Sequence, residues 1–585
     1  PTDLVGVATW SIASGLDLVL GFSSDRRQAG MAIESLGLNE PNELRRDPLG
    51  IAFSHGPLHW GHTPDPGVMV LPERSSLEVR PGRQPSLIDL LGEQRTLGQR
   101  GNRERAIESL SQAMRQLAHS MRVVDGRKYI VLLSEGFDSS VVLGQGGGSN
   151  FEEQLAIQRQ NNASAYGTYE DVDSNARFGD TSLQNELGRV LRELVRADCV
   201  IQAVDIGGLR AGTGAQVGEQ NKQGLFLLAN GTGGGLYENY NNLTEAMGQM
   251  LDRTSVTYVL AFHAENLKLD GEFHRLQVIL EGRPDGYRVV HRPGYFAPRP
   301  YSALSQTERR LSAASQLFGK PGGELKVATL AAPFKASSQW AYIPSLIEVG
   351  GPDLLKGRQD GKVTAEIFAY AIAANGEVRD YYSQILGIDL EKAGPALEQK
   401  GLKFWSEFAV PPGEYVARVL VRNAATGASG VSVFPFRVPD AKQEEPALLV
   451  PLFPEPAGQW LNVRGQRAEN SEHTYPFTVQ GRAFEPAVKP ILVPGQSAAV
   501  LLVGYGLGDT VRITGELLTS EGNPAGGVFL NVGERRPAEE PGLSQWAATL
   551  STSPIEPGDY ILQVTATDPQ SGESYSSSIT ISVSG

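Results

Sequence analysis

The pattern of apolar positions changes along the chain. Over residues 126–254, continuous apolar runs alternate with segments whose apolar residues recur at helical spacing. The clearest run, Tyr129–Leu133, follows a basic turn and ends abruptly at Ser-Glu-Gly. Runs of this kind are typical of parallel strands buried on both faces. The alternation therefore predicts a doubly wound α/β domain over residues 1–298, whose ligand-binding loops lie at the carboxyl ends of the strands.

Further strands and helices are predicted within this domain. Strands are expected at Leu4–Ala8, Leu16–Leu20 and Val200–Val204, and a strand-like run lies at Leu225–Ala229. Apolar residues at helical spacing predict helices near residues 26–36, 103–121, 183–195 and 242–250. Residues 38–100 are rich in Pro, Gly, Arg and His without a sustained period, which indicates a long surface insertion.

From Ser255 the apolar period becomes two, which is typical of β-strands. Strands at Tyr258–Phe262, Phe273–Leu280 and Tyr287–His291 predict an antiparallel meander that extends the α/β domain over residues 255–298. A helical linker is expected over 299–323, with its helix at 306–318. Beyond this linker, helical spacing almost disappears from the sequence.

The last part of the chain contains a repeat. Pro412-Gly413-Glu414-Tyr415-Val416 recurs as Pro557-Gly558-Asp559-Tyr560-Ile561, and Thr426-Gly427 recurs as Ser571-Gly572 at the same offset. Each copy ends in a β-rich strand. A Pro-Gly turn that leads into an alternating hairpin near a domain's end favours two tandem Ig-like β-sandwiches, which we place at residues 324–440 and 441–585.

Composition narrows the range of functions. The 585 residues carry a net charge of −14, which argues against a nucleic-acid partner, and no run of 18 apolar residues could span a membrane as a helix. The one cysteine, Cys199, lies at the start of a predicted buried strand, so a disulfide framework is excluded and a thiol nucleophile is not expected. The sequence begins at Pro1 without a signal peptide, and we expect this start to follow processing or truncation.

Several short motifs occur in a characteristic order across residues 1–298. They are Asp3-Leu4-Val5-Gly6-Val7, Phe22-Ser23-Ser24-Asp25, Gly126-Arg127-Lys128, Leu133-Ser134-Glu135-Gly136, Asp205 with Gly208-Leu209, Leu228-Ala229 with Thr232-Gly233-Gly234, and Arg292-Pro293-Gly294-Tyr295. In this order and spacing the region resembles the von Willebrand factor A-related domain of secreted Acidobacteria proteins. The resemblance implies a Rossmann-type fold and export to the cell surface, the periplasm or the medium.

The resemblance also implies a degenerate metal site. Von Willebrand A domains hold Mg²⁺ or Mn²⁺ through an Asp-x-Ser-x-Ser motif, a Thr and a third-loop Asp, and a partner carboxylate completes the coordination. Here the third loop falls on Ser134-Glu135-Gly136, so Glu135 and Asp138 become the candidate ligands. The first motif is absent, which implies a first strand upstream of Pro1 or supplied otherwise.

A histidine cluster gives a second candidate metal site. His55, His59 and His62 lie within eight residues, with Asp65 nearby, and imidazoles at this spacing can bind zinc. The surrounding residues are loop-like, so an exposed loop without metal is the alternative. The glycine-rich stretch after Leu228 lacks the ending of a phosphate-binding loop, and no Gly-x-Ser-x-Gly motif of a serine hydrolase occurs.

These observations favour a non-enzymatic, secreted adhesion or scaffold protein. Its protein partner is expected at the carboxyl-edge loops, at Ser134, Glu135, Phe137 and Asp138 and across Ser134–Asp180, with Gly207–Gly224 beside them. Permanent contacts through the sandwich edges would instead make it a structural subunit of a larger assembly. A zinc-dependent hydrolase built on the histidine cluster is the remote alternative.

Overall fold

The structure, a computed structural model, describes residues 3–12, 15–34, 45–54, 91–137, 139, 142, 180–206, 214–238, 243–254, 268, 270–279, 281–282, 294–335, 339–356, 361–440, 445–469, 473, 475–479, 481–508, 510–537, 542–552 and 555–584. The chain divides into two compact units. Unit 1 comprises Pro1–Val7, Leu20–Val70 and Ala313–Gly585, and unit 2 comprises Ala8–Val19 and Leu71–Ser312. No helix among these described residues is long and apolar enough to cross a bilayer.

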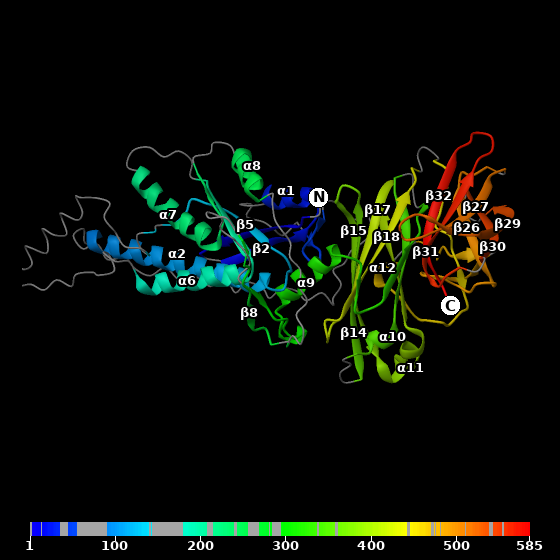
Figure 1. Ribbon diagram of the computed structural model, residues 1–585, viewed down its shortest axis with the longest axis horizontal. Coiled ribbons are helices and arrows are strands. Elements are labelled where there is room, and N and C mark those ends of the chain that lie inside the picture. Colours follow the sequence, from blue (N-terminus) through cyan, green and yellow to red (C-terminus); the bar gives the residue numbers. More distant parts are fainter. Residues whose placement is uncertain are drawn as a thin grey trace, which may run out of the picture. The chain divides into compact units, whose positions relative to one another are not determined.

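Unit 2 contains a small parallel sheet with helices. The sheet consists of β5 (Lys128–Ser134), β6 (Cys199–Asp205) and β7 (Leu236–Tyr237), and the helices are α2 (Leu91–Met121), α6 (Thr181–Arg196), α7 (Gly214–Thr232) and α8 (Leu243–Thr254). Asp180 caps α6, because its carboxylate accepts hydrogen bonds from the Ser182 and Leu183 amides. Helices α2 and α6 lie side by side (Figure 1), joined by an ion pair of 3.0 Å between Arg115 and Glu186.

The prediction of a doubly wound α/β, von Willebrand A-like fold is wrong. Most elements of the chain are strands in many small sheets, and the described parallel sheet has three strands in the simple order β5-β6-β7. A doubly wound sheet needs a point where the strand order reverses. Alternating strand and helix signals reveal that parallel strands are present, but they carry no information about strand order.

Three local predictions in the amino-terminal half also need correction. Leu225–Ala229 lies within α7 and is not a strand, because a short apolar run does not distinguish a buried helix turn from a strand. Helix α2 begins at Leu91, twelve residues before the predicted start at 103. Part of the predicted surface insertion is core, since Leu49, Ile51 and Ala52 are buried.

The predicted meander is described only in part. Strand β8 (Phe273–Arg275) is shorter than predicted and pairs antiparallel with β9 (Gly294–Phe296). The strands predicted at Tyr258–Phe262 and Tyr287–His291 lie outside the described residues. A 3₁₀ turn (Tyr301–Ala303) and helix α9 (Gln306–Phe318) follow, and α9 coincides with the predicted linker helix. Ser305 and Glu308 form the capping box of α9.

Unit 1 contains the β-sandwiches, whose β-rich character the sequence predicts correctly. One five-stranded sheet has the order β10-β18-β17-β14-β15, made of β10 (Gly322–Gly323), β14 (Lys362–Ala373), β15 (Val378–Asp389), β17 (Gly413–Asn423) and β18 (Ser429–Val438). Its partner sheet contains β11 (Val327–Ala331), β12 (Phe334–Lys335), β13 (Ala341–Val349), β16 (Leu402–Val410) and β21 (Leu461–Arg464). Short helices α10 (Gly351–Leu354) and α11 (Leu390–Lys400) connect strands of these sheets. We call this pair of sheets the first sandwich.

Amino-terminal residues cover the outer face of the first sandwich. This segment includes the end of hairpin β1 (Val5–Ser11) and β2 (Gly15–Ser23), helix α1 (Arg26–Glu34), β3 (Arg45–Arg46) and β4 (Phe53–Ser54). Leu49 and Ile51 pack with Ala313 and Leu317 of α9 against Tyr370 of β14. Asp25 both caps α1 and accepts a hydrogen bond from the Val378 amide of β15, at 2.9 Å. The sheet is consequently buried on both faces.

The second sandwich also consists of two sheets. One sheet has the order β19-β26-β30-β29 and the other β25-β32-β31-β27-β28. Their strands are β19 (Ala447–Leu448), β25 (Ile491–Leu492), β26 (Ser497–Tyr505), β27 (Arg512–Leu518), β28 (Pro524–Gly526), β29 (Val528–Pro537), β30 (Leu543–Thr552), β31 (Gly558–Thr567) and β32 (Ser574–Val583). Between the sandwiches lie helix α12 (Gln466–Glu469) and the short pairs β20 (Pro454–Glu455) with β24 (Glu485–Pro486) and β22 (Thr478–Val479) with β23 (Arg482–Ala483).

The hydrophobic core of the second sandwich continues onto one face of the first. Phe334, Tyr342 and Leu346 of the first sandwich belong to the same buried cluster as Leu502 and Trp546 of the second. Strand β21 follows β19 of the second sandwich in sequence but pairs parallel with β16 of the first. Side chains and main chain therefore join the two sandwiches into one body. The predicted boundaries of the two sandwich domains, 324–440 and 441–585, stay predictions.

Candidate functional site

The predicted partner site lies at the carboxyl end of β5 in unit 2. Ser134 ends the strand, Glu135 is exposed, and Gly136 and Phe137 are half-buried. The Ser134 hydroxyl accepts a hydrogen bond from the Gly136 amide at 3.0 Å, which folds the loop back over the strand end. Asp138, the other candidate ligand for Mg²⁺ or Mn²⁺, lies outside the described residues.

Helix α7 closes tightly over this loop. Gly136 has a φ of +88°, and a Cβ atom there would lie 2.2 Å from the main-chain oxygen of Asn221. A Cβ atom on Gly224 would lie 2.6 Å from the main-chain oxygen of Phe137. Both positions therefore require glycine, because the two backbones are in contact. This packing fixes the backbone of the loop that carries Glu135.

The candidate metal ligands remain predictions. His55, His59 and His62, with Asp65, lie outside the described residues, as does Asp138. Among the residues that the structure does describe, no group of three His, Cys, Asp or Glu side chains converges closely enough to hold a metal ion. Asp205 ends the neighbouring strand β6 opposite Ser134 and is buried. The degenerate metal site is thus represented here by Glu135 alone.

Two other sequence motifs have structural roles. Cys199 is buried at the start of β6, as predicted, and burial raises the pKa of its thiol to about 11, which suppresses the reactive thiolate. The glycine-rich stretch ends helix α7, where the Gly234 amide bonds to the Ala229 oxygen and the Gly233 amide to the Asn230 oxygen. This pair of bonds, with Gly233 at a φ of +85°, is a Schellman motif.

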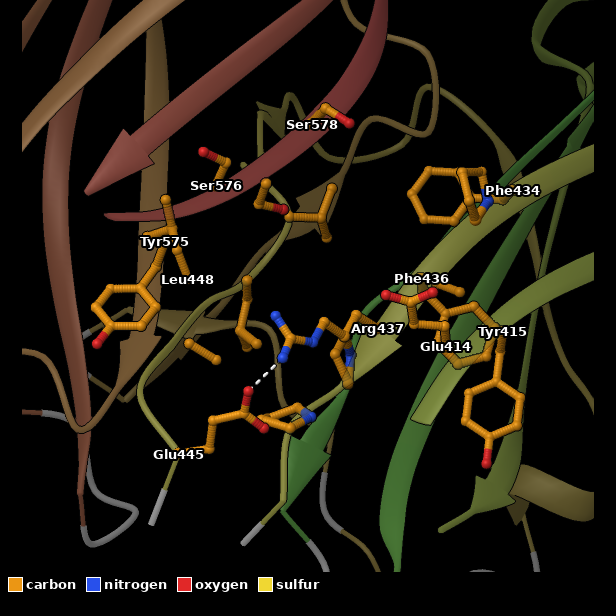
Figure 2. Close-up of a pocket in the computed structure, with 18 of the residues that line it drawn as sticks. Glu414, Tyr415, Phe434, Phe436, Arg437, Glu445, Leu448, Tyr575, Ser576 and Ser578 are labelled. Carbon is orange, nitrogen blue, oxygen red and sulfur yellow. Dashed lines mark hydrogen bonds and ion pairs between the residues drawn. The ribbon is translucent and has the colours of Figure 1, made fainter. Parts of the chain in front are cut away.

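A groove lined by described residues lies in unit 1. It has a volume of about 420 Å³, and we call it the inter-sandwich groove. Its lining consists of Ala331, Pro333, Ala374, Glu414–Val416, Phe434–Arg437, Pro439, Glu445–Val450 and Ser574–Ser578. Figure 2 shows Phe434, Phe436 and Tyr415 of the first sandwich on one side and Tyr575, Ser576 and Ser578 of β32 on the other. The groove therefore lies between the two copies of the repeated hairpin.

The floor of the groove carries the charged side chains of Arg437 and Glu445, the wall on the first sandwich is aromatic, and the wall on β32 carries one tyrosine and four serines. Arg437 forms an ion pair with Glu445, drawn in Figure 2 between the two walls, and the other Glu445 oxygen accepts a bond from the Asp440 amide. The rings of Tyr415 and Phe436 stack with centroids 5.5 Å apart. Burial raises the pKa of Tyr415, whose hydroxyl donates to the Pro411 oxygen at 2.8 Å. Tyr415 therefore stays neutral and contributes a fixed wall.

Buried ion pairs join the first sandwich to the segment that lies between the sandwiches. Lys403 of β16 lies 2.9 Å from Glu348 of β13 and 2.6 Å from Glu455 of β20, and it donates to the Pro486 oxygen. Burial raises the pKa of Glu348, although the charge of Lys403 opposes this rise. Arg467 makes two bonds to Asp380, of 2.7 and 3.1 Å. Paired and fully bonded charges of this kind tolerate little relative movement.

Comparisons with known proteins leave the chain without an assigned family. No family model and no curated protein matches it. Among solved structures, it is similar to the C-terminal domain of the Streptococcus pyogenes antigen I/II-family protein AspA, at 11% identity and a TM-score of 0.14, over 44% of this chain and 99% of that one.

Two further structures show similarities of the same weakness. The ZirS C-terminal domain matches at 14% identity and a TM-score of 0.12, over 20% of this chain and 79% of that one. A family 123 glycoside hydrolase from Clostridium perfringens matches at 10% identity and a TM-score of 0.14, over 17% of this chain and 22% of the hydrolase. At these TM-scores none of the similarities assigns a function, and membership of the von Willebrand A-related family stays a prediction.

Sequence reasoning identified the repeated hairpins but not the groove between them. The repeat is the sequence feature that relates to the groove, because Glu414, Tyr415 and Ser571-Gly572 all belong to the repeated motif. Two sandwiches that repeat the same terminal hairpin can present two sheet edges. That these edges line one cavity depends on how the sandwiches pack, which no local pattern specifies.

Proposed function

We propose that this chain is a non-enzymatic binding protein that recognises a protein partner through the inter-sandwich groove. The observation that carries the proposal is the groove itself, an open cavity of about 420 Å³ with one aromatic wall, one serine-rich wall and a charged floor. Cavities that combine an apolar lining with a few placed polar groups are the usual form of binding sites. The proposal includes an extracellular, cell-surface or periplasmic location, which cell fractionation would test.

The rigidity of the junction supports recognition rather than catalysis. Lys403 and Arg467 are paired in the buried interface, so the groove walls are fixed before a partner arrives. Binding to a preformed site avoids the ordering cost that a flexible surface has to meet. The charged side chains that line the groove, Glu414, Arg437 and Glu445, form no arrangement of nucleophile and base. These three charged side chains are suited to selecting a partner by its charge.

Selection from a random dodecapeptide library displayed on phage would test the proposal. The intact chain serves as bait, and Ala374→Trp, an exposed change in the groove lining, serves as the blocked variant. Ala425→Trp is the matched control, because Ala425 is also exposed but lies at the far turn of the β17–β18 hairpin, outside the groove. We expect peptides that bind the intact chain and the Ala425→Trp variant but bind Ala374→Trp at least tenfold more weakly.

Two results would contradict the groove as the binding site. One is the failure of any peptide to be enriched over the unselected library. The other is enrichment of peptides that bind all three proteins equally. A stable assembly of the purified chain with a fixed partner, seen by size-exclusion chromatography of native extracts, would favour the alternative role as a structural subunit.

The predicted carboxyl-edge loop is a second candidate surface, favoured by apolar exposure. Leu133 and Ile206 are 45% and 55% exposed, and they lie beside exposed Glu135 at one end of the sheet. Exposed aliphatic side chains next to a carboxylate suit a protein contact at Ser134, Glu135, Phe137 and Asp138. If Mg²⁺ or Mn²⁺ takes part, either ion raises the melting temperature of the intact chain but not of Glu135→Ala. A rise with Zn²⁺ alone would instead indicate the histidine cluster.

A further inference from the structure

We propose that the inter-sandwich groove binds its partner as an added β-strand, paired with the outer edge of β32. This inference rests on the proposed function and specifies its mode of recognition. An extended peptide that joins a sheet edge gains affinity from main-chain hydrogen bonds and specificity from alternate side chains. The required features are an unpaired strand edge, space beside it, and side chains that select the guest.

The outer edge of β32 is unpaired over most of its length. Among the described strands, β25 pairs with this edge only at Ser582 and Val583, whereas β31 covers the whole inner edge. The Ser582 amide donates outward to the Pro490 oxygen at 2.8 Å. Because main-chain groups of alternate residues face the same edge, those of Ser574, Ser576 and Ser578 also face outward, into the groove that they line.

The equivalent edge of β18 differs in a way that identifies β32 as the docking edge. Strand β18 carries Pro435 and Arg437 where it lines the groove, and proline and charged residues are the usual protection of sheet edges. Strand β32 has neither over Ser574–Ser578, where three of its serines are exposed. An unprotected edge that is shielded inside a groove is open to a guest strand yet sheltered from aggregation.

The dimensions of the groove fit one extended segment rather than a second folded copy. Ser574–Ser578 extends about 13 Å, since a strand rises about 3.3 Å per residue. A paired strand lies only about 5 Å from its neighbour, and the wall formed by Phe434–Arg437 lies on the other side of the groove. A second copy would have to bring a whole sheet edge into this space, and the net charge of −14 opposes self-association.

The lining also specifies the chemistry of the guest. Phe434, Leu448 and Tyr575 line the groove and favour an apolar side chain at every second position of the peptide. Glu414 and Glu445 outnumber the single cation Arg437, so a lysine or arginine in the guest complements the floor. The occupant we infer is an extended partner segment with alternating apolar residues and one basic residue.

A proline variant at the edge tests the pairing. Ser578→Pro removes one outward amide and leaves the inner edge paired with β31, while Ser578→Thr keeps the amide and suits a strand. The probe is the tightest-binding dodecapeptide from the phage selection, labelled with fluorescein. We expect Ser578→Pro to weaken binding at least tenfold, and Ser578→Thr to change it less than twofold. Melting temperatures of both variants check that they fold.

Alternately N-methylated peptides supply the second arm, because each methyl group removes one main-chain donor of the guest. Methylation along one edge of the peptide is expected to abolish binding, and methylation along the opposite edge to preserve most of it. In the intact chain, hydrogen exchange at residues 574–580 is expected to slow when the unmodified peptide is bound.

The outcomes separate this inference from the proposed function. Peptides that require an open groove but are insensitive to Ser578→Pro and to N-methylation would overturn strand addition and leave the groove as a binding site. Equal sensitivity to methylation along both edges would also overturn pairing with β32 alone. If the selection enriches no peptide, both the groove as a binding site and the addition of a strand to β32 are contradicted.

Discussion

The two copies of the repeated hairpin have the same turns but different surroundings. In β17–β18 and in β31–β32, a tyrosine donates to a carbonyl four residues upstream, Tyr415 to Pro411 and Tyr560 to Glu556. Gly427 and Gly572 close both turns, with φ values of +77° and +76°. The first hairpin nevertheless lies in a sheet covered on both faces, whereas the second shows the alternating burial of a sheet with one solvated face.

The difference in coverage between the two sheets is visible in the burial of β17 and β31. Strand β17 is buried at every position from Val419 to Asn423, and residues near Leu49 and helix α9 pack on its outer side, where Leu420 lies. Strand β31 alternates apolar residues with Gln563, Thr565 and Thr567. The repeated motif therefore specifies the hairpin. The burial of the residues between its shared turn positions shows whether one or both faces of the sheet are covered.

The largest effect is expected where the two sandwiches meet. Lys403→Ala leaves Glu348 buried without its cation, which should lower the free energy of unfolding by about 3–5 kcal/mol. Lys489→Ala is the control, because its ion pair with Asp559 is exposed and should contribute about 0–1 kcal/mol. Urea unfolding followed by tryptophan fluorescence measures both. Similar losses in the two variants would contradict a junction that depends on buried charge.

The outer faces of the two hairpins should differ next most. Leu420 is fully buried beneath the amino-terminal segment, so Leu420→Ala should cost about 2–5 kcal/mol. Thr565 occupies the same position in the second hairpin and bonds only to Ser576 across the strand pair, so Thr565→Ala should cost about 0.2–1 kcal/mol. The denaturant midpoints of the two variants measure this difference. Equal costs would mean that the outer layer adds no stability to the first sheet.

The shared tyrosines should show a smaller difference. Removing either hydroxyl deletes one hydrogen bond, worth about 0.5–1.5 kcal/mol. Tyr415→Phe should fall at the upper end of this range because Tyr415 is buried, and Tyr560→Phe at the lower end because its bond is exposed. Thermal melting of the two variants provides the measurement. A larger loss at Tyr560 would reverse the assignment of the more buried hairpin.

The smallest effect concerns acid sensitivity of the second hairpin. Hydrogen bonds from Lys489 and Ser582 lower the pKa of Asp559 below its ordinary 3.8. A carboxyl whose pKa is lowered on folding stabilises the fold above its unfolded pKa, and this contribution disappears as the pH falls through the folded value. Asp559→Asn should remove it, at less than about 0.5 kcal/mol because the pair is exposed. Unfolding between pH 6 and pH 2.5 tests this, and a steeper acid dependence in the variant would contradict it.

The sequence by itself determined the local elements and the repeat. Apolar spacing predicted α6 and α9, the continuous run at Tyr129–Leu133 predicted β5, and the Pro-Gly motifs predicted where β17 and β31 begin. These features depend on neighbours within a few residues, where spacing, capping and turn preferences act directly.

Only the tertiary structure decided strand order, the covering of the first sandwich and the existence of the groove. The burial of Leu49 and Ile51 against Tyr370 joins residues more than 300 positions apart, for which residues 38–100 show no local signal. The edges of β18 and β32 line one cavity because a continuous core joins the sandwiches, and Lys403 and Arg467 join the first sandwich to the segment between them. Such contacts depend on the complementarity of distant surfaces, and a hydrophobic pattern specifies that a face is buried but not against what.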